Sequence, residues 1–326
     1  MIKKILWVTF GVFAVTALLG LGYVERLLGL IGREEAEGIT PSQLEQMQSQ
    51  EDGTEDLPVY DPADIWVPEG VAAREDGRVH ILLIGQDRRD SASRSLSDAM
   101  ILCSFDPEEG ELTMTSFLRD SYVRIPGYGN NKLNAAYPLG GMALLDKTLG
   151  ENFGVPVDGN IEVDFSQFAA IIDLLGGVEL SLTEAEVQHL AHEYGFQLHA
   201  GVNRLSGEEA LGYARIRKLG TDFARTDRQR KVLTALIEQF RYAGIRKLTG
   251  VLKEVLGLIT TDMTNGQILR YAAMLAPKLG DLEIRSQYIP AQGTYSFGDA
   301  GNIRSCIFLD FDANRAILSQ TILDDD

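Results

Sequence analysis

The stretch Val79-His-Ile-Leu-Leu-Ile-Gly-Gln-Asp87 decides the fold class. Its short apolar run is followed by a glycine, which is typical of a buried strand. Two more apolar runs, Met100-Ile-Leu-Cys-Ser-Phe105 and Leu112-Thr-Met-Thr-Ser-Phe117, lie on either side of Asp106-Pro-Glu-Glu-Gly110. Turn-forming residues between two apolar runs predict a β-hairpin. We therefore expect the folded part of the chain to begin near Val79 with strands of a sheet.

Further along the chain, helical patterns alternate with a strand pattern. We expect helices over residues 141–149, 166–175 and 222–242 and a strand over 178–182. Ser206-Gly-Glu-Glu209 matches a capping box, which opens a further helix. Mixed helices and strands predict a layered α/β domain with a central mixed β-sheet flanked by helices. The core face of the longest helix is predicted to carry Val232, Leu233, Leu236, Ile237 and Phe240.

The N-terminus carries a membrane signal. Lys3 and Lys4 precede an uncharged apolar run over residues 5–24, whose length of about twenty residues suits one bilayer crossing. Lysines before the run and Glu25 after it predict that the N-terminus faces the cytoplasm and the rest lies outside. A cleaved signal peptide is the alternative, but the run is long for one and no Ala-x-Ala site follows. Residues 1–32 are thus predicted to be a cytoplasmic tip and transmembrane anchor.

The next stretch, residues 33–78, is rich in Glu and Gln and has few large apolar residues. Such a composition buries little core, so we expect an acidic extracellular linker that holds the domain off the membrane. Residues 79–244 are expected to form the main folded domain. Residues 245–326 are expected to be a C-terminal extension that packs on the same domain.

The charge of the chain excludes one class of partner. Its 326 residues carry a formal net charge of −17, with a sequence pI near 4.7. Nucleic-acid binding depends on neutralising phosphates with Lys and Arg, so we expect no nucleic-acid partner. The two cysteines, Cys103 and Cys306, are either a disulfide pair or two buried thiols, and the sequence leaves both open.

Against this acidic background, residues 213–231 hold seven basic and two acidic residues. Arg215 and Arg217 are two apart, so in an extended stretch they would point the same way. Arg225, Arg228 and Gln229 share one face of a helix. The planar guanidinium binds phosphate oxygens in pairs, so the two sets could converge on one anion. The alternative is a solvated charged helix face.

One acidic residue follows the first predicted strand, and another precedes the second. Asp87 ends the first apolar run and Asp98 precedes the second, in loops where binding residues tend to lie. Two carboxylates near a phosphate suit Mg²⁺, with Mn²⁺ as an alternative ion, whereas turn-forming aspartates are the simpler interpretation. Arg119 and Asp120 follow the third strand and could meet the same phosphate or form a structural ion pair.

These motifs together resemble the LytR–CpsA–Psr (LCP) family of cell-envelope transferases, over residues 79–240. The matching motifs are Ile81-Leu-Leu-Ile-Gly-Gln-Asp87, Ser97-Asp-Ala-Met-Ile101, Ser116-Phe-Leu-Arg-Asp-Ser-Tyr122, Ile125-Pro-Gly-Tyr-Gly129, Lys132-Leu-Asn-Ala-Ala-Tyr137, Asp173-Leu-Leu-Gly-Gly-Val178, Leu205-Ser-Gly-Glu-Glu-Ala-Leu211, Tyr213-Ala-Arg-Ile-Arg217 and Asp222-Phe-Ala-Arg-Thr-Asp-Arg-Gln229. An LCP-type fold is therefore expected.

The resemblance implies a phosphotransferase that moves a phosphate-linked glycopolymer, such as teichoic acid or capsule, from a polyprenyl-pyrophosphate carrier to peptidoglycan. It places Mg²⁺ on Asp87 and Asp98 and adds Asp222 as a polar active-site position. The implied pyrophosphate ligands are Arg119, Arg215, Arg217, Arg225 and Gln229.

The chain departs from the family pattern at two positions. Leu96 stands where the family often has arginine, with Arg94 as a nearby substitute, and Ala224 stands where glycine is usual. The change at Leu96 bears on reaction rate or substrate choice more than on the class of enzyme.

As a mechanism, arginines would clamp the pyrophosphate while Asp98 or Asp120 takes the proton of an acceptor hydroxyl. Phe165, Phe168 and Leu174 are candidates for a polyprenyl groove, or simply core. A polyprenyl-pyrophosphate hydrolase and a non-catalytic regulatory module remain as alternatives.

Overall fold

The structure is a computed structural model that describes residues 22, 24–34, 38–49, 57–72, 77–87, 94–242 and 245–323. Nearly all of the predicted anchor, residues 5–24, lies outside the described residues. Among the described residues, every helix is too short or too polar to cross a bilayer.

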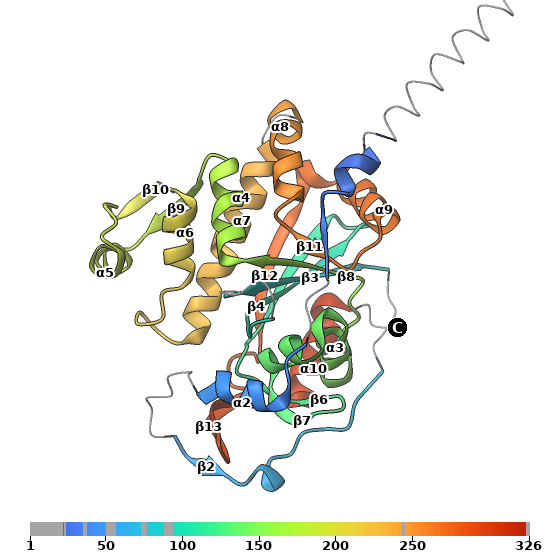
Figure 1. Cartoon of the computed structure of the whole chain (residues 1–326), viewed down its shortest axis with the longest axis vertical. Coiled ribbons are helices and arrows are strands. Elements are labelled where there is room, and N and C mark those ends of the chain that lie inside the picture. The colour runs from blue at the N-terminus through green and yellow to red at the C-terminus, as the bar shows by residue number, and fades with distance from the viewer. Residues whose placement is uncertain are drawn as a thin grey trace, which may run out of the picture.

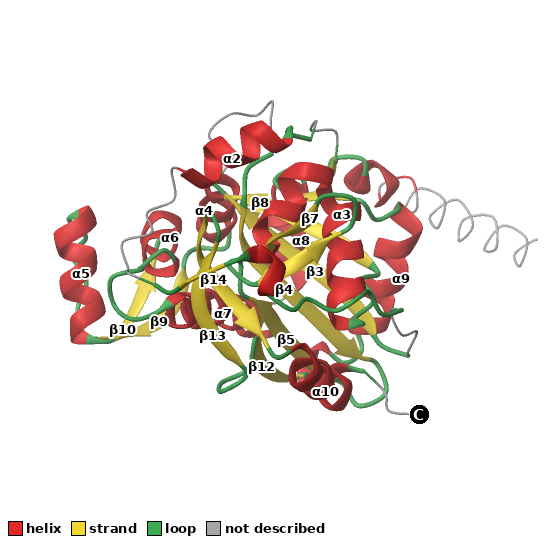
Figure 2. Cartoon of the chain, turned by 90° about the horizontal axis from the view of Figure 1, so that it is seen from below, coloured by secondary structure: helices red, strands yellow, loops and turns green. Residues whose placement is uncertain are grey.

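A seven-stranded mixed sheet forms the centre of the molecule (Figures 1 and 2). Its inner strands β3, β4 and β5 are antiparallel neighbours, and β8 and β12 pair in parallel with β3 and β5. The strands in spatial order are β1 (Gly32–Arg33), β11 (Thr260–Thr261), β8 (Gly159–Asp164), β3 (Val79–Gln86), β4 (Ser97–Asp106), β5 (Glu111–Phe117) and β12 (Glu283–Ile289).

One face of this sheet is fully covered. It packs against α3 (Ala136–Phe153), α10 (Phe311–Ile322) and α2 (Pro41–Ser49), which lie together below the sheet in Figure 1. The strand residues on this side have almost no exposed surface: Leu82, Ile84, Met100 and Leu102. This is the main hydrophobic core, and it sets the positions of β3 and β4, whose ends carry the candidate site.

The other face is covered less completely. It lies under α7 (Asp222–Tyr242), α4 (Phe165–Leu174), α8 (Ile245–Leu256) and α9 (Asn265–Leu275) (Figure 1). Several apolar residues of the strands on this side remain half-buried: Ile81, Leu83, Cys103, Ile161 and Val163. The sheet thus has one sealed face and one face that retains accessible apolar surface.

A small lobe extends from the helical layer beside α7. A two-stranded sheet of β9 (Val178–Leu182) and β10 (Gly201–Leu205) supports α5 (Glu184–Tyr194) and leads into α6 (Gly207–Ala214). The lobe has its own apolar cluster, which includes Val178, Leu190 and Tyr213. It forms the left side of the molecule in Figure 1.

Short strands complete the molecule beside α3. β13 (Tyr295–Ala300) pairs with β14 (Ile303–Leu309) and with β2 (Val59–Tyr60). β6 (Tyr122–Ile125) and β7 (Gly129–Lys132) form a second small hairpin. Cys306 on β14 and Cys103 on β4 are both free thiols, each in a different apolar cluster.

The predicted α/β layering, central mixed sheet and hairpin are confirmed. The helix predicted over residues 222–242 has those bounds, and the capping box at Ser206 is present. Its predicted core residues Val232 and Leu236 are buried, whereas Leu233 and Ile237 are partly buried. The strands β12 to β14 in residues 245–326 were not predicted.

The expectation that residues 33–78 bury little core is wrong for the segment that includes α2. Ile39 and Leu44 lie in the main core, although the sequence around them is polar. Just before it, β1 pairs in parallel with β11, and Gly32 N donates to Ile259 O at 2.9 Å. A few apolar side chains and backbone hydrogen bonds suffice to dock a segment whose average composition is that of a linker.

Candidate functional site

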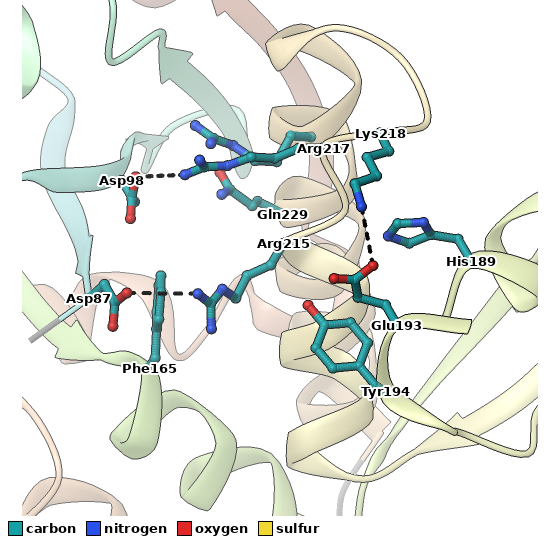
Figure 3. A pocket seen from close by; sticks show the side chains of 11 residues that line it. Asp87, Asp98, Phe165, His189, Glu193, Tyr194, Arg215, Arg217, Lys218 and Gln229 are labelled. Carbon is teal, nitrogen blue, oxygen red and sulfur yellow. Dashed lines mark hydrogen bonds and ion pairs between the residues drawn. The ribbon is translucent and has the colours of Figure 1, made fainter. Parts of the chain in front are cut away.

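A cavity of about 310 Å³ opens at the end of the sheet where β3 ends and β4 begins (Figure 3). The N-terminus of α4, the C-terminal half of α5, the end of α6 and the first turns of α7 complete its walls. The residues that line it are Asp87, Asp98, Phe165, His189, Glu193, Tyr194, Arg215, Arg217, Lys218, Arg225 and Gln229.

The two predicted metal ligands lie together on the sheet side. Asp87 directly follows β3, and Asp98 is the second residue of β4, so the antiparallel pairing of these strands brings the two carboxylates to one edge. Asp98 was expected in a loop before the strand, but it belongs to the strand. Asp98 Oδ1 accepts a hydrogen bond from Arg119 Nη1 at 2.6 Å.

Arg215 and Arg217 face these carboxylates. Arg215 Nη2 lies 3.7 Å from Asp87 Oδ2, and Arg217 Nη2 lies 3.8 Å from Asp98 Oδ1. The guanidinium of Arg215 also lies over the Phe165 ring, 4.6 Å from its centroid. The arginine side chains are 44% and 60% exposed, so both can reach a ligand.

Arg215 and Arg217 both point into the cavity, but for a reason other than the predicted extended conformation. Arg215 caps the C-terminus of α6 in helical conformation, with φ −97° and ψ −2°, and is not part of an extended strand. Between the arginines, Ile216 is only 1% exposed and packs into the lobe. Burial of that one side chain orients both neighbours towards the cavity.

The first turns of α7 supply Arg225 and Gln229. Arg225 is 3% exposed, and its Nη2 lies 2.9 Å from Asp222 Oδ1. Burial lowers the pKa of Arg225, although a guanidinium remains protonated in proteins. Asp222 therefore holds Arg225 in place and does not itself line the cavity.

Arg228 does not join this set, although the helical spacing predicted that it would. Its Nε donates to Glu186 Oε1 at 2.9 Å, and its Nη1 and Nη2 donate to the carbonyls of Ile216 and Leu219. This buried arginine ties α7 to α5 and to the loop that carries Arg217.

Arg119 and Asp120 lie behind the cavity wall. Asp120 Oδ2 is 3.5 Å from Arg119 Nε, and its Oδ1 is 3.0 Å from Lys132 Nζ. Burial alone raises the pKa of Asp120, but Arg119 and Lys132 outweigh it and hold that pKa below its ordinary range. Asp120 is thus a fixed negative charge between two cations, and Arg119 links it to Asp98.

Arg94 does not substitute at the cavity for the arginine that Leu96 replaces. Its Nη2 lies 3.0 Å from Glu34 Oε1, and its guanidinium lies 5.9 Å from the centroid of the Tyr137 ring. Leu96 itself packs at the edge of the main core. Neither of these two described residues therefore supplies a cation to the cavity at that place.

The fit of a divalent cation depends on its coordination chemistry. Among the described residues, no group of three or more His, Cys, Asp or Glu side chains could hold a metal ion. Mg²⁺, however, usually keeps several waters and takes only one or two carboxylates besides substrate phosphates. The pair Asp87 and Asp98 fits such a partly shared site, and their contacts with Arg215 and Arg217 are long enough to open.

The lobe contributes residues that sequence reasoning missed. His189, Glu193 and Tyr194 from α5, and Lys218 from the loop after α6, line the cavity opposite the aspartates. No local motif marks the α5 residues, because only the fold brings this helix beside the basic segment. Lys218 was visible within the basic run but had no partner assigned.

Comparisons with known proteins show what the whole chain is similar to. A family model described as the LytR_cpsA_psr family matches residues 41–305. Regulatory protein MsrR of Staphylococcus aureus (strain COL) is 30% identical over 257 residues, 78% of this chain and 76% of MsrR.

Two further similarities concern a protein named as a transferase. Polyisoprenyl-teichoic acid–peptidoglycan teichoic acid transferase TagT of Bacillus subtilis (strain 168) is 36% identical over 166 residues, 49% of this chain and 52% of TagT. A solved structure described as TagT bound to LIIa-WTA has a TM-score of 0.62 and 25% identity. It covers 84% of this chain and 97% of that chain.

Proposed function

The chain belongs to the LytR–CpsA–Psr family, and on that premise we propose that it is a Mg²⁺-dependent phosphotransferase. Its substrate is a phosphate-linked glycopolymer on a polyprenyl-pyrophosphate carrier, and its acceptor is peptidoglycan. The name of its relative TagT, a teichoic acid transferase acting on peptidoglycan, supports this reaction class.

One observation carries the proposal: two carboxylates face three arginines across a single cavity. Arg215, Arg217 and Arg225 offer planar forks that match phosphate oxygens. Asp87 and Asp98 would hold Mg²⁺, which neutralises charge on the pyrophosphate when it is bound. A site with both signs of charge would suit a diphosphate bound together with a cation better than a simple anion.

The reaction requires little from the protein beyond positioning and charge stabilisation. An acceptor hydroxyl attacks the glycan-proximal phosphorus, the bond from that phosphorus to the bridging oxygen breaks, and polyprenyl phosphate leaves. We assign Asp98 as the base that takes the hydroxyl proton, because it lines the cavity. Asp120 is held as an anion between Arg119 and Lys132 outside the cavity lining, so it positions Arg119 instead.

The partly covered face of the sheet supports a lipid carrier. Cys103 retains accessible surface there, as do Leu83 and Ile161 on the neighbouring strands. Half-buried apolar side chains can bury further surface against an apolar ligand. Phe168 is half-buried on the same side, and Phe165 links it to the cavity. We propose that the polyprenyl chain lies along this face.

The cellular location follows from the N-terminal sequence. We propose that residues 5–24 anchor the chain in the cell membrane as a single span with the domain outside, since two lysines precede the run. A carrier lipid confined to the bilayer then lies within reach of the site.

A non-catalytic regulator is the second candidate. MsrR is named a regulatory protein, and Leu96 stands where the family often has an arginine. A hydrolase that transfers the same group to water would use the same clamp.

The test uses the full chain with a polyprenyl-pyrophosphate oligosaccharide, with and without Mg²⁺ and peptidoglycan fragments. A conjugate that requires both, and is lost in Arg215→Ala, supports the transferase. The matched control is Arg204→Ala, which removes an exposed arginine paired with Glu179 on β9 and should leave activity unchanged. Lipid phosphate released without conjugate identifies a hydrolase, and tight binding without turnover identifies a regulator.

A further inference from the structure

One wall of the cavity has no part in the phosphate chemistry. His189, Glu193 and Tyr194 of α5 lie with Lys218 on the far side of Arg215 and Arg217 from the aspartates (Figure 3). We propose that this wall is a saccharide subsite that binds an uncharged sugar ring, the one attached to the pyrophosphate. This assignment rests on the proposed function and adds the part of the substrate that the arginines do not contact.

The subsite is built on an aromatic platform. The rings of Tyr194 and Phe196 are stacked, with centroids 5.2 Å apart and an interplanar angle of 15°. Tyr194 is 43% exposed although it borders the cavity. An exposed aromatic face with negative potential attracts the polarised C–H groups on the face of a pyranose ring, and the tyrosine hydroxyl adds a polar contact.

The platform is held rigidly against α6. Gly212 of α6 lies so close to the rings that an added Cβ would be 2.9 Å from Phe196 Cε2 and 3.4 Å from Tyr194 Cε2. The helix that carries Tyr194 ends there in a left-handed Gly195, with φ 75°. The chain therefore turns sharply and returns Phe196 beneath Tyr194. Rings fixed in this way lose little freedom when a ligand stacks on them.

The charges beside the platform favour a neutral ligand. Glu193 Oε2 and Lys218 Nζ are 3.4 Å apart, and both side chains are well exposed. An exposed pair of this kind contributes little to stability, so both groups can turn to donate to or accept from sugar hydroxyls. The pair carries no net charge, so it attracts a further phosphate much less than the arginines do. The strongly basic part of the cavity and this neutral part thus suit two different portions of one substrate.

The experiment compares two ligands on the full chain in detergent by calorimetry: octaprenyl pyrophosphate, and the same lipid carrying N-acetylglucosamine. We expect the wild type to bind the sugar-bearing lipid more tightly. Tyr194→Ala should weaken binding of that lipid about 10-fold and leave the sugar-free lipid unchanged. Tyr194→Phe should retain most of the difference, because it keeps the stacked ring.

Two controls separate the subsite from general damage. Tyr128→Ala removes another exposed tyrosine, in the turn between β6 and β7 and outside the cavity lining, and should change neither affinity. Arg215→Ala should weaken both ligands alike. Equal wild-type affinity for the two lipids, or an equal loss of both in Tyr194→Ala, would overturn the subsite and leave the proposed function standing. If the wild type binds neither lipid, both proposals fail.

Discussion

At the residue scale, Arg228 shows how a side chain in a catalytic-looking motif can serve structure. It is buried and donates to Glu186 and to two backbone carbonyls. These carbonyls flank the loop that holds Arg217 and Lys218. Its contribution to function is therefore indirect, through the position of other residues.

Arg228→Ala should lower the free energy of unfolding by about 3 kcal/mol, because it leaves the buried Glu186 carboxylate without its cation. The control Arg204→Ala breaks an exposed pair with Glu179 and should cost less than about 1 kcal/mol. Urea unfolding of both variants measures the difference. Equal losses would show that Arg228 is not the structural link described.

A second residue makes stability depend on pH. Burial raises the pKa of Asp146 to about 7, Asn160 opposes this by donating to it, and nearby Asp262 adds to the rise. The folded state keeps this proton up to neutral pH, whereas the unfolded chain loses it near pH 4. Stability from this group is therefore lost as the pH rises from about 4 to 7.

Asp146→Asn should reduce the fall in thermal midpoint between pH 5 and 7.5, because the amide mimics the neutral acid. Asp312→Asn, which changes an exposed aspartate, should leave the fall as in the wild type. Thermal unfolding across this pH range measures both, and an unchanged slope in Asp146→Asn would contradict the assignment.

Much of the candidate site was predictable at this scale. Asp87, Asp98, Arg215, Arg217, Arg225 and Gln229 all line one cavity. The residues mis-assigned from the sequence, such as Arg228 and Arg94, depend on the partner that the side chain finds. Helical spacing predicts which residues share a face of a helix. It does not predict that Glu186, from a helix distant in the sequence, forms an ion pair with Arg228 on that face.

At the element scale, Gly212 allows α6 to pack closely against α5 and the residues that follow it. The absence of a Cβ there lets the Phe196 and Tyr194 rings approach the helix closely. A glycine in a helix interior costs roughly 1 kcal/mol relative to alanine, so its presence has to serve another purpose.

Gly212→Ala should displace the rings and destabilise the fold by about 1 kcal/mol or more, despite its better helix propensity. It should also weaken binding of the sugar-bearing lipid relative to the sugar-free one. In Gly266→Ala on α9, the added Cβ would lie 4.0 Å from Thr264 Oγ1, an ordinary contact, so this variant should be neutral or stabilising. If the two alanine variants behave alike in unfolding and calorimetry, the close approach has no energetic role.

Elements with strong local signals were predictable, and those defined by distant pairing were not. The hairpin of β4 and β5 has turn residues between two apolar runs, and α7 has helical periodicity. In contrast, β12 is a strand because it pairs with β5, which lies more than 160 residues earlier in the chain. Its sequence, half polar and at the sheet edge, carries little sign of that pairing.

At the scale of the whole molecule, the two faces of the central sheet differ in coverage. The face under α3 is sealed, whereas the face under α4 and α7 keeps half-buried apolar residues such as Leu83 and Cys103. A domain built only for stability would close both faces. The open face is where the proposed polyprenyl chain would lie.

Cys103→Phe should fill part of that space and weaken binding of a long polyprenyl pyrophosphate by about 10-fold, with little effect on a ten-carbon analogue. Cys103→Ser keeps the size and should keep the chain-length dependence. The measurement is the affinity of the long and the short ligand for each of the two variants. Equal weakening of the short and long ligands would exclude this face as the lipid path.

The pairing of β1 with β11 also has a mechanical consequence. Only residues 25–31 separate the proposed anchor from β1, which is a strand of the central sheet, so the domain has no long tether. The distance between the cavity and the membrane surface would then be nearly constant, and the domain would rotate together with the anchor. If the proposed function holds, encounter with a carrier lipid would be a search in two dimensions, governed by lateral diffusion and orientation, and the acceptor would have to reach the cavity from outside the membrane.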